Sequence, residues 1–407
     1  MSDQTAGDTR PVLWIVTRDL GVGSQVWMLR QIAALRRFRP VIVTWADHRA
    51  PEVVAQMGVE VHVVPFPADL AVGGHRWLNR LQRLGSGNFY ATGGAERRHL
   101  LALAEADRPA AILAHFGHAG LRVLPVGQAR GVPVVCHFHG LDLSSALGNR
   151  WYRWSLLRYI GDFAAVVTVG TRQRDWVIRR FPRPHDLYLI PCGVPVAEFS
   201  RSAAEAALPP PVVPVFAVVS RLVPQKGVDW CLRAFARLPR GAARLQIVGD
   251  GPEHAPLVAL ARDLGLGDEV AFLGALPPAG VRQVLAGATA FLQHSLDAPD
   301  GWYEGFGVTV AEASAMEVPT IASRCGGLMD QITDGETGIL VAQRDVEGLA
   351  AAMRRLMSDP ALCQTLGRAA RVRALRDFDT TGQVEKLETA LFAAIAAKSK
   401  VQVSSDQ

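Results

Sequence analysis

Short apolar runs alternate with longer amphipathic segments along this chain. Apolar runs of about four to eight residues are typical of strands buried on both faces, and apolar residues at every third or fourth position are typical of helices. The alternation therefore predicts parallel sheets covered by helices. The expected strands are 12–17, 41–44, 59–64, 110–114, 132–137, 164–169 and 187–190, followed by 212–219, 245–248, 269–273, 288–292, 320–322 and 338–341.

The alternation stops once, near the middle of the chain, and then begins again. The segment 201–214 contains three successive prolines, which continue neither a helix nor a central strand, so we interpret it as a linker. The sequence thus predicts an α/β protein with two Rossmann-like, doubly wound domains facing a cleft at the carboxyl ends of their strands. The expected segments are a first domain over 1–200, the linker over 201–214, a second domain over 215–380, a C-terminal helix over 381–397 for which crossing back to the first domain is one option, and a disordered tail over 398–407.

Composition agrees with a globular protein of more than one domain. Of 407 residues, 49% are hydrophobic, which excludes wholesale disorder, and a single core rarely grows past about 300 residues. No apolar run approaches the roughly 20 residues that cross a bilayer, and the polar amino terminus does not resemble a signal peptide. Five scattered cysteines without a C-x-x-C pair argue against disulfides and structural zinc. We therefore expect a cytoplasmic protein.

Positive charge is concentrated in the first half of the chain. The net charge is +5, yet residues 1–200 contain 23 Arg and no Lys against 15 acidic residues, whereas residues 201–407 contain 20 basic and 23 acidic residues. This asymmetry favours an anionic partner for the first half, either a phosphate-bearing substrate or a membrane surface, although solvated helix faces account for most arginines. We expect no nucleic-acid partner.

One segment of the first half combines basic and aromatic residues. The stretch 147–160 contains Arg150, Arg153 and Arg158 among tryptophans and tyrosines. Such a helix suits a lipid headgroup interface or an anionic acceptor, and a half-buried helix with a solvated arginine edge is the alternative. Peripheral contact with the inner face of a membrane is therefore a hypothesis.

Two cations follow the first strand of the second domain. Arg221 and Lys226 lie in the loop 220–227, and Gly227 opens a helix. Arginine offers a fork that fits phosphate oxygens and lysine a point charge, so the pair suits a diphosphate. A solvated loop with two ordinary charges is the alternative that spacing alone leaves open.

Glycines mark two further loops of this domain. Gly251 lies in a turn after the next strand, where a positive φ or a close ligand requires glycine. Gly305 and Gly307 flank Phe306 directly before a helix, which leaves the backbone bare at that point. Amide hydrogens and the positive end of the helix can then face an anion or sugar hydroxyls.

Two carboxylates accompany these amides. Glu304 precedes them and Glu312 lies about two helical turns further on, so both side chains can reach one elongated ligand. The string E-G-F-G-V-T-V-A-E, which begins at Glu304, resembles the signature of the family-four, retaining GT-B glycosyltransferases, in which an Arg and Lys loop precedes it. The stretch 293–301 is similar to that of the colanic-acid and related exopolysaccharide transferases. In this family the second glutamate binds the ribose, which implies that role for Glu312.

The resemblance covers nearly the whole chain and implies a GT-B fold and a reaction. It implies that Arg221 and Lys226 bind the diphosphate of a nucleotide sugar, which we expect to be UDP- or GDP-linked. These cations and the helix end would replace a metal ion, so we expect no metal or other cofactor. Glu304 and the amides of Phe306 and Gly307 would hold the donor sugar. The implied acceptor is a glycan or a lipid-diphosphate-linked oligosaccharide, and the implied setting is exopolysaccharide or cell-surface polysaccharide synthesis with retention of configuration. The group that deprotonates the acceptor stays open, with the departing phosphate as one candidate.

Histidines end two strands of the first domain. His115 and His118 follow one strand and His137 and His139 end the next, shortly before Asp142. Four imidazoles at neighbouring strand ends could form a zinc site, but no cysteine or acidic residue completes a convincing ligand set, so we expect no metal. The resemblance implies instead that His139 lies near the reacting sugar and that His115, His118 and Asp142 lie on the acceptor side. A packed histidine is the alternative for at least one of the four.

Other motifs carry less weight. Gly23 follows the first strand, where a loop could approach a phosphate, but Val26 replaces the third glycine of a dinucleotide fingerprint, so an NAD site with Asp47 is disfavoured. The D-x-D of Asp377 and Asp379 lies beside a late helix, and we interpret it as structural. The rival functions are a nucleotide-sugar epimerase or phosphorylase on the same fold, and a non-catalytic nucleotide- or glycan-binding module.

Overall fold

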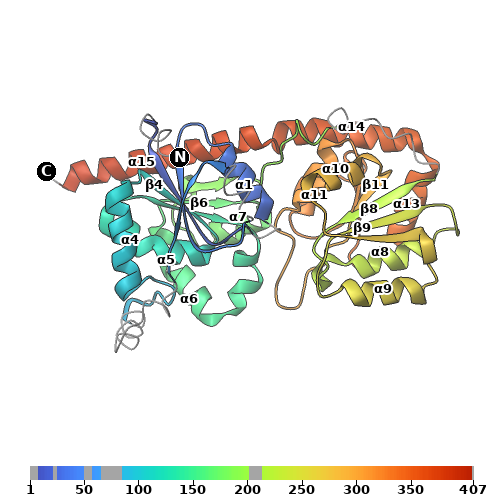
Figure 1. Ribbon diagram of the computed structural model, residues 1–407, viewed down its shortest axis with the longest axis horizontal. Coiled ribbons are helices and arrows are strands. Elements are labelled where there is room, and N and C mark those ends of the chain that lie inside the picture. Colours follow the sequence, from blue (N-terminus) through green and yellow to red (C-terminus); the bar gives the residue numbers. More distant parts are fainter. Residues whose placement is uncertain (1–7, 22–24, 50–56, 66–84, 201–212, 406–407) are drawn as a thin grey trace. The chain divides into compact units, whose positions relative to one another are not determined.

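The computed structural model describes residues 8–21, 25–49, 57–65, 85–200 and 213–405. Contacts divide the chain into unit 1, Met1–Pro191 with Gln383–Gln407, and unit 2, Cys192–Gly382. Each unit has its own parallel sheet (Figure 1), and each has its own hydrophobic core. Most of the expected linker, 201–212, lies outside the described residues.

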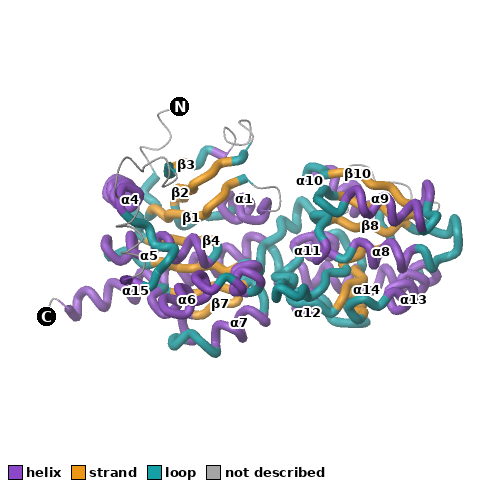
Figure 2. The backbone as a smooth tube through the Cα atoms, turned by 90° about the horizontal axis from the view of Figure 1, so that it is seen from below, coloured by secondary structure: helices purple, strands orange, loops and turns teal. Residues whose placement is uncertain are grey.

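Unit 1 is built on seven parallel strands among the residues described. Their order is β3-β2-β1-β4-β5-β6-β7, and Figure 2 shows the first four following one another across the sheet. The strands are β1 (Val12–Leu20), β2 (Arg39–Asp47), β3 (Glu60–Val63), β4 (Ala111–His115), β5 (Val134–Phe138), β6 (Ala165–Thr168) and β7 (Leu187–Leu189), and the helices are α1 (Val26–Ala33), α4 (Gly94–Asp107), α5 (Gly117–Arg130), α6 (Arg150–Tyr159), α7 (Thr171–Ile178) and α15 (Thr380–Ser405). The order reverses between β1 and β4, a switch point at which open α/β sheets bind ligands.

Unit 2 repeats this layout with six parallel strands in its described part. Their order is β10-β9-β8-β11-β12-β13, and α8 and α9 cover one face of the sheet while α10 and α11 cover the other (Figure 1). The strands are β8 (Val215–Val219), β9 (Arg244–Val248), β10 (Val270–Gly274), β11 (Ala290–Gln293), β12 (Thr320–Ser323) and β13 (Gly338–Val341), and the helices are α8 (Val228–Phe235), α9 (His254–Asp263), α10 (Pro278–Ala286), α11 (Val308–Ala315), α12 (Leu328–Gln331), α13 (Val346–Ser358) and α14 (Pro360–Asp377).

The strands expected from the sequence are confirmed, with ends that shift by a few residues. Burial explains this agreement, because the central strands are apolar on both faces: Trp14 and Ile15 are neighbours on β1 and both are fully buried. The prediction of two doubly wound α/β sheets is therefore confirmed. No helix in the described ranges is long and apolar enough to cross a bilayer.

The carboxyl-terminal helix corrects one expectation. We expected a disordered tail over 398–407, and α15 instead continues to Ser405. A helix that is already formed gains one hydrogen bond for each residue it adds, so a polar end can propagate where it would not nucleate. Glu388 anchors α15 in unit 1, since its Oε1 accepts hydrogen bonds from the amides of Arg36 and Arg37 at 3.0 and 2.7 Å. Phe392 packs on Phe38 with ring centroids 4.6 Å apart.

The units divide at 191 and 382, where the sequence analysis placed boundaries at 200 and 380. The segment after β7 pairs with the residues that follow α14. The amide of Val194 donates to the carbonyl of Phe378 at 2.8 Å, and the amide of Thr380 donates to the carbonyl of Val194 at 3.0 Å. These bonds place 192–200 with unit 2.

Candidate active site

The loop after β8 presents its two cations in different settings. Arg221 is exposed and forms no ion pair with any residue the structure describes, whereas Lys226 is partly buried at the end of the 3-10 helix Pro224–Lys226. Gly227 has a φ of +59°, and a Cβ there would lie 2.1 Å from the carbonyl oxygen of His294. The two loops can pack this closely only with glycine at 227, and this packing fixes Lys226 beside the segment after β11.

Lys226 is held by Glu304. Its Nζ lies 2.5 Å from Oε2 of Glu304, whose side chain is 9% exposed. Ser295 Oγ donates to the same oxygen at 2.9 Å and accepts a hydrogen bond from Gln293 Nε2 at 2.8 Å, while the Trp302 ring centroid lies 5.6 Å from Nζ. An ion pair that is hydrogen-bonded and largely shielded from water keeps both charges in fixed positions. The structure thus brings together two residues singled out in the sequence.

The amino-terminal end of α11 lies directly after Glu304. Gly307 is the N-cap of α11 and has a φ of +85°. Because glycine has no side chain, the N-cap residue offers no capping hydrogen bond, and the first turn of α11 contains no acidic residue. Gln331 Nε2 donates to the carbonyls of Phe306 and Gly307. In a trans peptide the N–H points away from the C=O, so the amides of Gly307 and Val308 face away from Gln331. These uncapped amides, with the positive end of the helix, form a setting for an anion or for hydroxyl oxygens.

Two glycines after β12 support the loop that carries Glu304. A Cβ at Gly326 would lie 2.1 Å from the carbonyl oxygen of Glu304, and one at Gly327 would lie 2.3 Å from that of Gly305. The amide of Gly327 donates to the carbonyl of Glu304 at 2.8 Å. The sequence analysis missed these residues and Gln331, and the glycine pair that follows a predicted strand was the signal that could have found them.

The remaining donor-side predictions also fall in unit 2. A Cβ at Gly251 would lie 2.3 Å from the carbonyl oxygen of Leu222, so this glycine packs on the loop that carries Arg221. Glu312 lies within α11 and is 7% exposed. Contact of Glu304 and Glu312 with one ligand stays a prediction.

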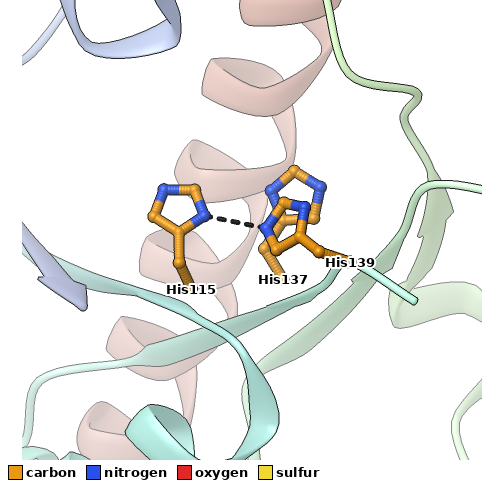
Figure 3. A group of neighbouring side chains, drawn as sticks. All are labelled: His115, His137 and His139. Atoms are coloured by element: carbon orange, nitrogen blue, oxygen red, sulfur yellow. Dashed lines mark hydrogen bonds between the residues drawn. The ribbon is translucent and has the colours of Figure 1, made fainter. Parts of the chain in front are cut away.

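Strand register gathers three histidines in unit 1. β4 pairs with β5 so that His115 lies opposite His137, and His139 follows two residues later on the same side. Ring centroids are 5.5 Å apart for His115 and His137 and 4.2 Å apart for His137 and His139, and Nδ1 of His115 lies 3.0 Å from Nε2 of His139 (Figure 3). Trp27 of α1 covers His139 with ring centroids 4.0 Å apart. The carboxyl end of this sheet thus has a compact imidazole cluster.

Asp142 holds the loop that follows these histidines. Its carboxylate accepts hydrogen bonds from the amides of Gly117 and His139 at 3.1 and 3.0 Å. Gly117 begins α5, so Asp142 also satisfies an amide at the start of that helix. Burial raises the pKa of Asp142 to about 6, and the hydrogen bonds from the backbone oppose this shift. Asp142 is therefore placed to position His139.

Comparison with known proteins decides the family. The model described as "Glycosyl transferase 4-like domain" matches residues 21–193, and the model described as "Glycosyl transferases group 1" matches residues 203–373. The GDP-mannose-dependent monoacylated alpha-(1-6)-phosphatidylinositol monomannoside mannosyltransferase of Corynebacterium glutamicum is 31% identical over 295 residues, which are 68% of this chain and 75% of that protein. This chain belongs to the family-four GT-B glycosyltransferases.

The proteins similar to this chain have different names. Glycogen synthase of Mycobacterium tuberculosis is 29% identical over 283 residues, which are 67% of this chain and 66% of that protein. The chain spans between 59% and 66% of the length of the first curated relatives it matches. The structure of Anabaena Alr3699/HepE in complex with UDP and glucose shares the fold, with a TM-score of 0.76, 20% identity, and coverage of 94% of this chain and 99% of that one.

The remaining motifs singled out in the sequence are Gly23, Asp47 and the D-x-D of Asp377 and Asp379. Gly23 falls outside the described residues. The carboxylate of Asp47 is bound by Arg49, with Nη2 and Oδ2 2.8 Å apart. Asp377 pairs with arginines of its own helix, and Asp379 accepts a hydrogen bond from the amide of Thr381 at 3.1 Å. The D-x-D therefore stabilises the junction of α14 and α15, in agreement with its structural interpretation.

Burial keeps the four histidines near the ends of β4 and β5 neutral at physiological pH. Burial lowers the pKa of His137 to about 3 and that of His118 to about 4. Burial also holds the pKa values of His115 and His139 well below their usual range. His118 packs on Phe116 with ring centroids 5.7 Å apart, outside the group of three.

These shifts predict acid sensitivity of the central sheet of unit 1. The pKa of His137 is about 3 in the folded protein and near 6.5 in the unfolded chain. The neutral imidazole therefore stabilises the fold fully above pH 6.5, and this contribution is lost as the pH falls towards 3. At about 1.4 kcal/mol for each pH unit, His137 alone removes about 3 kcal/mol between pH 6.5 and pH 4. The raised pKa of Asp142 acts in the opposite direction, since its contribution is lost as the pH rises through about 6.

Hydrogen exchange of the β4 and β5 amides at pH 7, 5.5 and 4 measures this sensitivity, once corrected for intrinsic exchange rates. We expect the opening free energy of these strands to fall towards pH 4. In His137→Gln the slope of this free energy against pH should be smaller by the equivalent of about one bound proton. An unchanged pH dependence in His137→Gln would contradict the assignment.

Proposed function

We propose that this protein transfers a sugar from a nucleotide diphosphate sugar to a hydroxyl group of an acceptor. The observation that carries the proposal is the grouping of Lys226, Glu304 and the uncapped end of α11 within unit 2. A cation and a helix end suit a diphosphate, and a fixed carboxylate suits the paired hydroxyls of a sugar. Membership of the glycosyltransferase family supports this assignment.

The proposed chemistry follows from the charge of the leaving group. Negative charge builds on the diphosphate as the glycosidic bond breaks, and Arg221, Lys226 and the amides of Gly307 and Val308 stabilise it without a metal ion. Lys226 then contacts both the diphosphate and Glu304. Glu304 positions the lysine and also contacts the donor sugar. Glu312 binds the ribose, and the anomeric configuration is retained. The departing phosphate is our candidate for the group that accepts the proton of the acceptor hydroxyl.

The proposed substrates are a UDP- or GDP-linked sugar and a glycan or lipid-diphosphate-linked acceptor. The Corynebacterium relative is named for GDP-mannose and a phosphatidylinositol mannoside, and the Anabaena structure contains UDP and glucose. We propose a cytoplasmic reaction of exopolysaccharide or cell-surface polysaccharide synthesis. His139 lies near the reacting sugar in this proposal, and His115, His118 and Asp142 line the acceptor side.

Release of free nucleoside diphosphate tests the proposal against its rivals. A thermal-shift screen of UDP- and GDP-sugars first identifies the donor, because a ligand at 100 times its Kd adds about 2.7 kcal/mol of stability. A transferase then releases nucleoside diphosphate at a rate that depends on an acceptor, with a mass increase of one sugar on that acceptor. Tight donor binding without turnover would identify a binding module, and isomerised nucleotide sugar would identify an epimerase.

The proposal includes peripheral contact with a membrane through α6. Trp151, Trp154 and Leu157 are 44%, 60% and 46% exposed, and three arginines of the same helix are exposed as well. Tyr152 and Leu156 are buried beneath them, and Trp151 packs on Phe89 with ring centroids 4.4 Å apart. Because α6 contains no acidic residue, this face suits anionic headgroups with tryptophans at the interface.

Vesicle flotation measures this contact. We expect binding to vesicles that contain phosphatidylglycerol and little binding to phosphatidylcholine vesicles. The triple variant Arg150→Ser, Arg153→Ser, Arg158→Ser should lower the partition coefficient at least tenfold, since each arginine near an anionic surface contributes about 1 kcal/mol. The matched control replaces three exposed arginines in α7 and directly after it (Arg172→Ser, Arg179→Ser, Arg180→Ser). Equal loss in both variants would contradict a specific role for α6.

A further inference from the structure

Unit 1 contains a cavity whose described lining includes none of the residues assigned to sugar transfer. Its volume is about 240 Å³, and it is lined by the segment before α4, the start of α4, the second half of α5 and the end of α6. α5 packs against both α4 and α6 (Figure 1). A water molecule occupies roughly 30 Å³ in the liquid. The cavity therefore has room for a group of several heavy atoms.

The amino-terminal end of α4 borders this cavity. Gly93, the N-cap, lines it, and no side chain of a described residue caps this helix of 14 residues. The amides of Gly94 and Ala95 have no acceptor within the helix, and the helix end has a partial positive charge. The acidic residue of the first turn, Glu96, does not line the cavity. It is buried and accepts a hydrogen bond from Nε of Arg122 at 2.6 Å, so its charge is already neutralised.

Two side chains of the cavity wall contain buried polar atoms without partners. Thr92 is 5% exposed, and its Oγ1 forms no hydrogen bond with any described residue. Nε of Arg97 is buried and also lacks a partner in the described ranges, where the guanidinium forms no ion pair. A buried polar atom without a partner destabilises the fold, and such atoms usually indicate a bound molecule. The cavity therefore lacks a component that the described chain does not provide.

The chemistry of the wall selects an anion. Backbone amides and a hydroxyl donate hydrogen bonds, and the guanidinium of Arg97 offers a fork that fits two oxygens of a phosphate. Asp162, outside the lining, accepts a hydrogen bond from Gln128 Nε2 at 3.2 Å, and no acidic residue belongs to the described lining. The hydroxyl of Tyr159 donates to the carbonyl of Ser86, which leaves its oxygen able to accept a hydrogen bond from a ligand hydroxyl.

We propose that Thr92, Arg97 and the first amides of α4 form a binding site for the phosphate group of a phosphate ester. The rest of the cavity, towards Tyr159, takes the organic group of the ester. Two sources present this chemistry, a soluble monoester such as glycerol phosphate and the diester headgroup of a phospholipid. The site agrees with the anionic partner that the arginine excess of residues 1–200 predicts. It does not rest on the proposed sugar transfer.

Calorimetric titration of the full-length protein tests this site. One arm uses glycerol 3-phosphate, and the other uses a short-chain phosphatidylglycerol below its critical micelle concentration. We expect saturable binding in at least one arm, and the arm that binds identifies the source of the phosphate. Arg97→Gln should raise the Kd at least tenfold, and the nearly isosteric Thr92→Val should raise it at least threefold. An unchanged far-ultraviolet circular dichroism spectrum of each variant shows that it is folded.

Two control variants separate this site from other cations of the chain. Arg98→Gln removes the next arginine of α4, which is exposed and outside the described lining, and should leave the Kd unchanged. Arg221→Ala removes a cation of the proposed diphosphate site and should also leave it unchanged. The proposal is overturned if neither ester binds to the wild-type protein, if Arg98→Gln weakens binding as much as Arg97→Gln, or if Arg221→Ala abolishes binding.

Discussion

Replacing Lys226 by alanine should lower kcat by a factor of about 10²–10³ while changing KM much less. The lost interaction is made with charge that appears only as the diphosphate departs, and removing one such donor from a preorganised site costs about 3–4 kcal/mol of transition-state stabilisation. Steady-state kinetics with the identified donor and acceptor measure this loss. Arg221→Ala should show a loss of the same kind, because its exposed guanidinium forms no ion pair with any described residue and is available to the phosphates.

A matched control removes the same charge elsewhere. Lys386 is exposed on α15, so Lys386→Ala should leave kcat unchanged. Loss of Lys226 also leaves the buried carboxylate of Glu304 without its cation, which destabilises the fold. The double variant Lys226→Met, Glu304→Gln should restore stability without restoring activity. Wild-type turnover by Lys226→Ala would contradict the assigned role.

Replacing Gly227 by alanine should destabilise unit 2 by about 3 kcal/mol or more. The left-handed conformation costs an alanine about 1–2 kcal/mol, and its Cβ would lie 2.1 Å from the carbonyl oxygen of His294, which is backbone and has little freedom to move. The two loops must separate, so Lys226 moves relative to Glu304 and donor binding weakens. Denaturant unfolding and donor titration measure the two effects.

Gly267 provides the control for this prediction. Its φ of +49° is also left-handed, but a Cβ there would meet nothing within 4 Å. Gly267→Ala should therefore cost only the backbone strain, about 1–2 kcal/mol, and leave donor binding unchanged. Equal destabilisation by the two variants would show that close packing at Gly227 contributes nothing.

The strands and the positions of the loop motifs could be predicted because each depends on residues close together in the sequence. An apolar run such as 12–17 carries its own signal, and Gly307 before α11 marks a helix start without reference to the rest of the chain. The family signature around Glu304 could be found in the same way, because it lies within one stretch of sequence.

The contacts that assemble the site could not be predicted, because they join residues far apart in the chain. The ion pair of Lys226 and Glu304 spans 78 positions. Gln331 reaches the carbonyl of Phe306 from α12. The pairing of His115 with His137 depends on the register of β4 against β5, which a pattern of apolar residues leaves undetermined by a residue or two. Such contacts follow from tertiary packing.

A crystal structure of the protein with its nucleotide diphosphate sugar tests the central claim most directly. We expect phosphate oxygens within hydrogen-bonding distance of Lys226 Nζ and of the amides of Gly307 and Val308, with the sugar hydroxyls against Glu304. The contradicting result is a nucleotide bound elsewhere, with Lys226 still paired only to Glu304 and the first turn of α11 free of ligand.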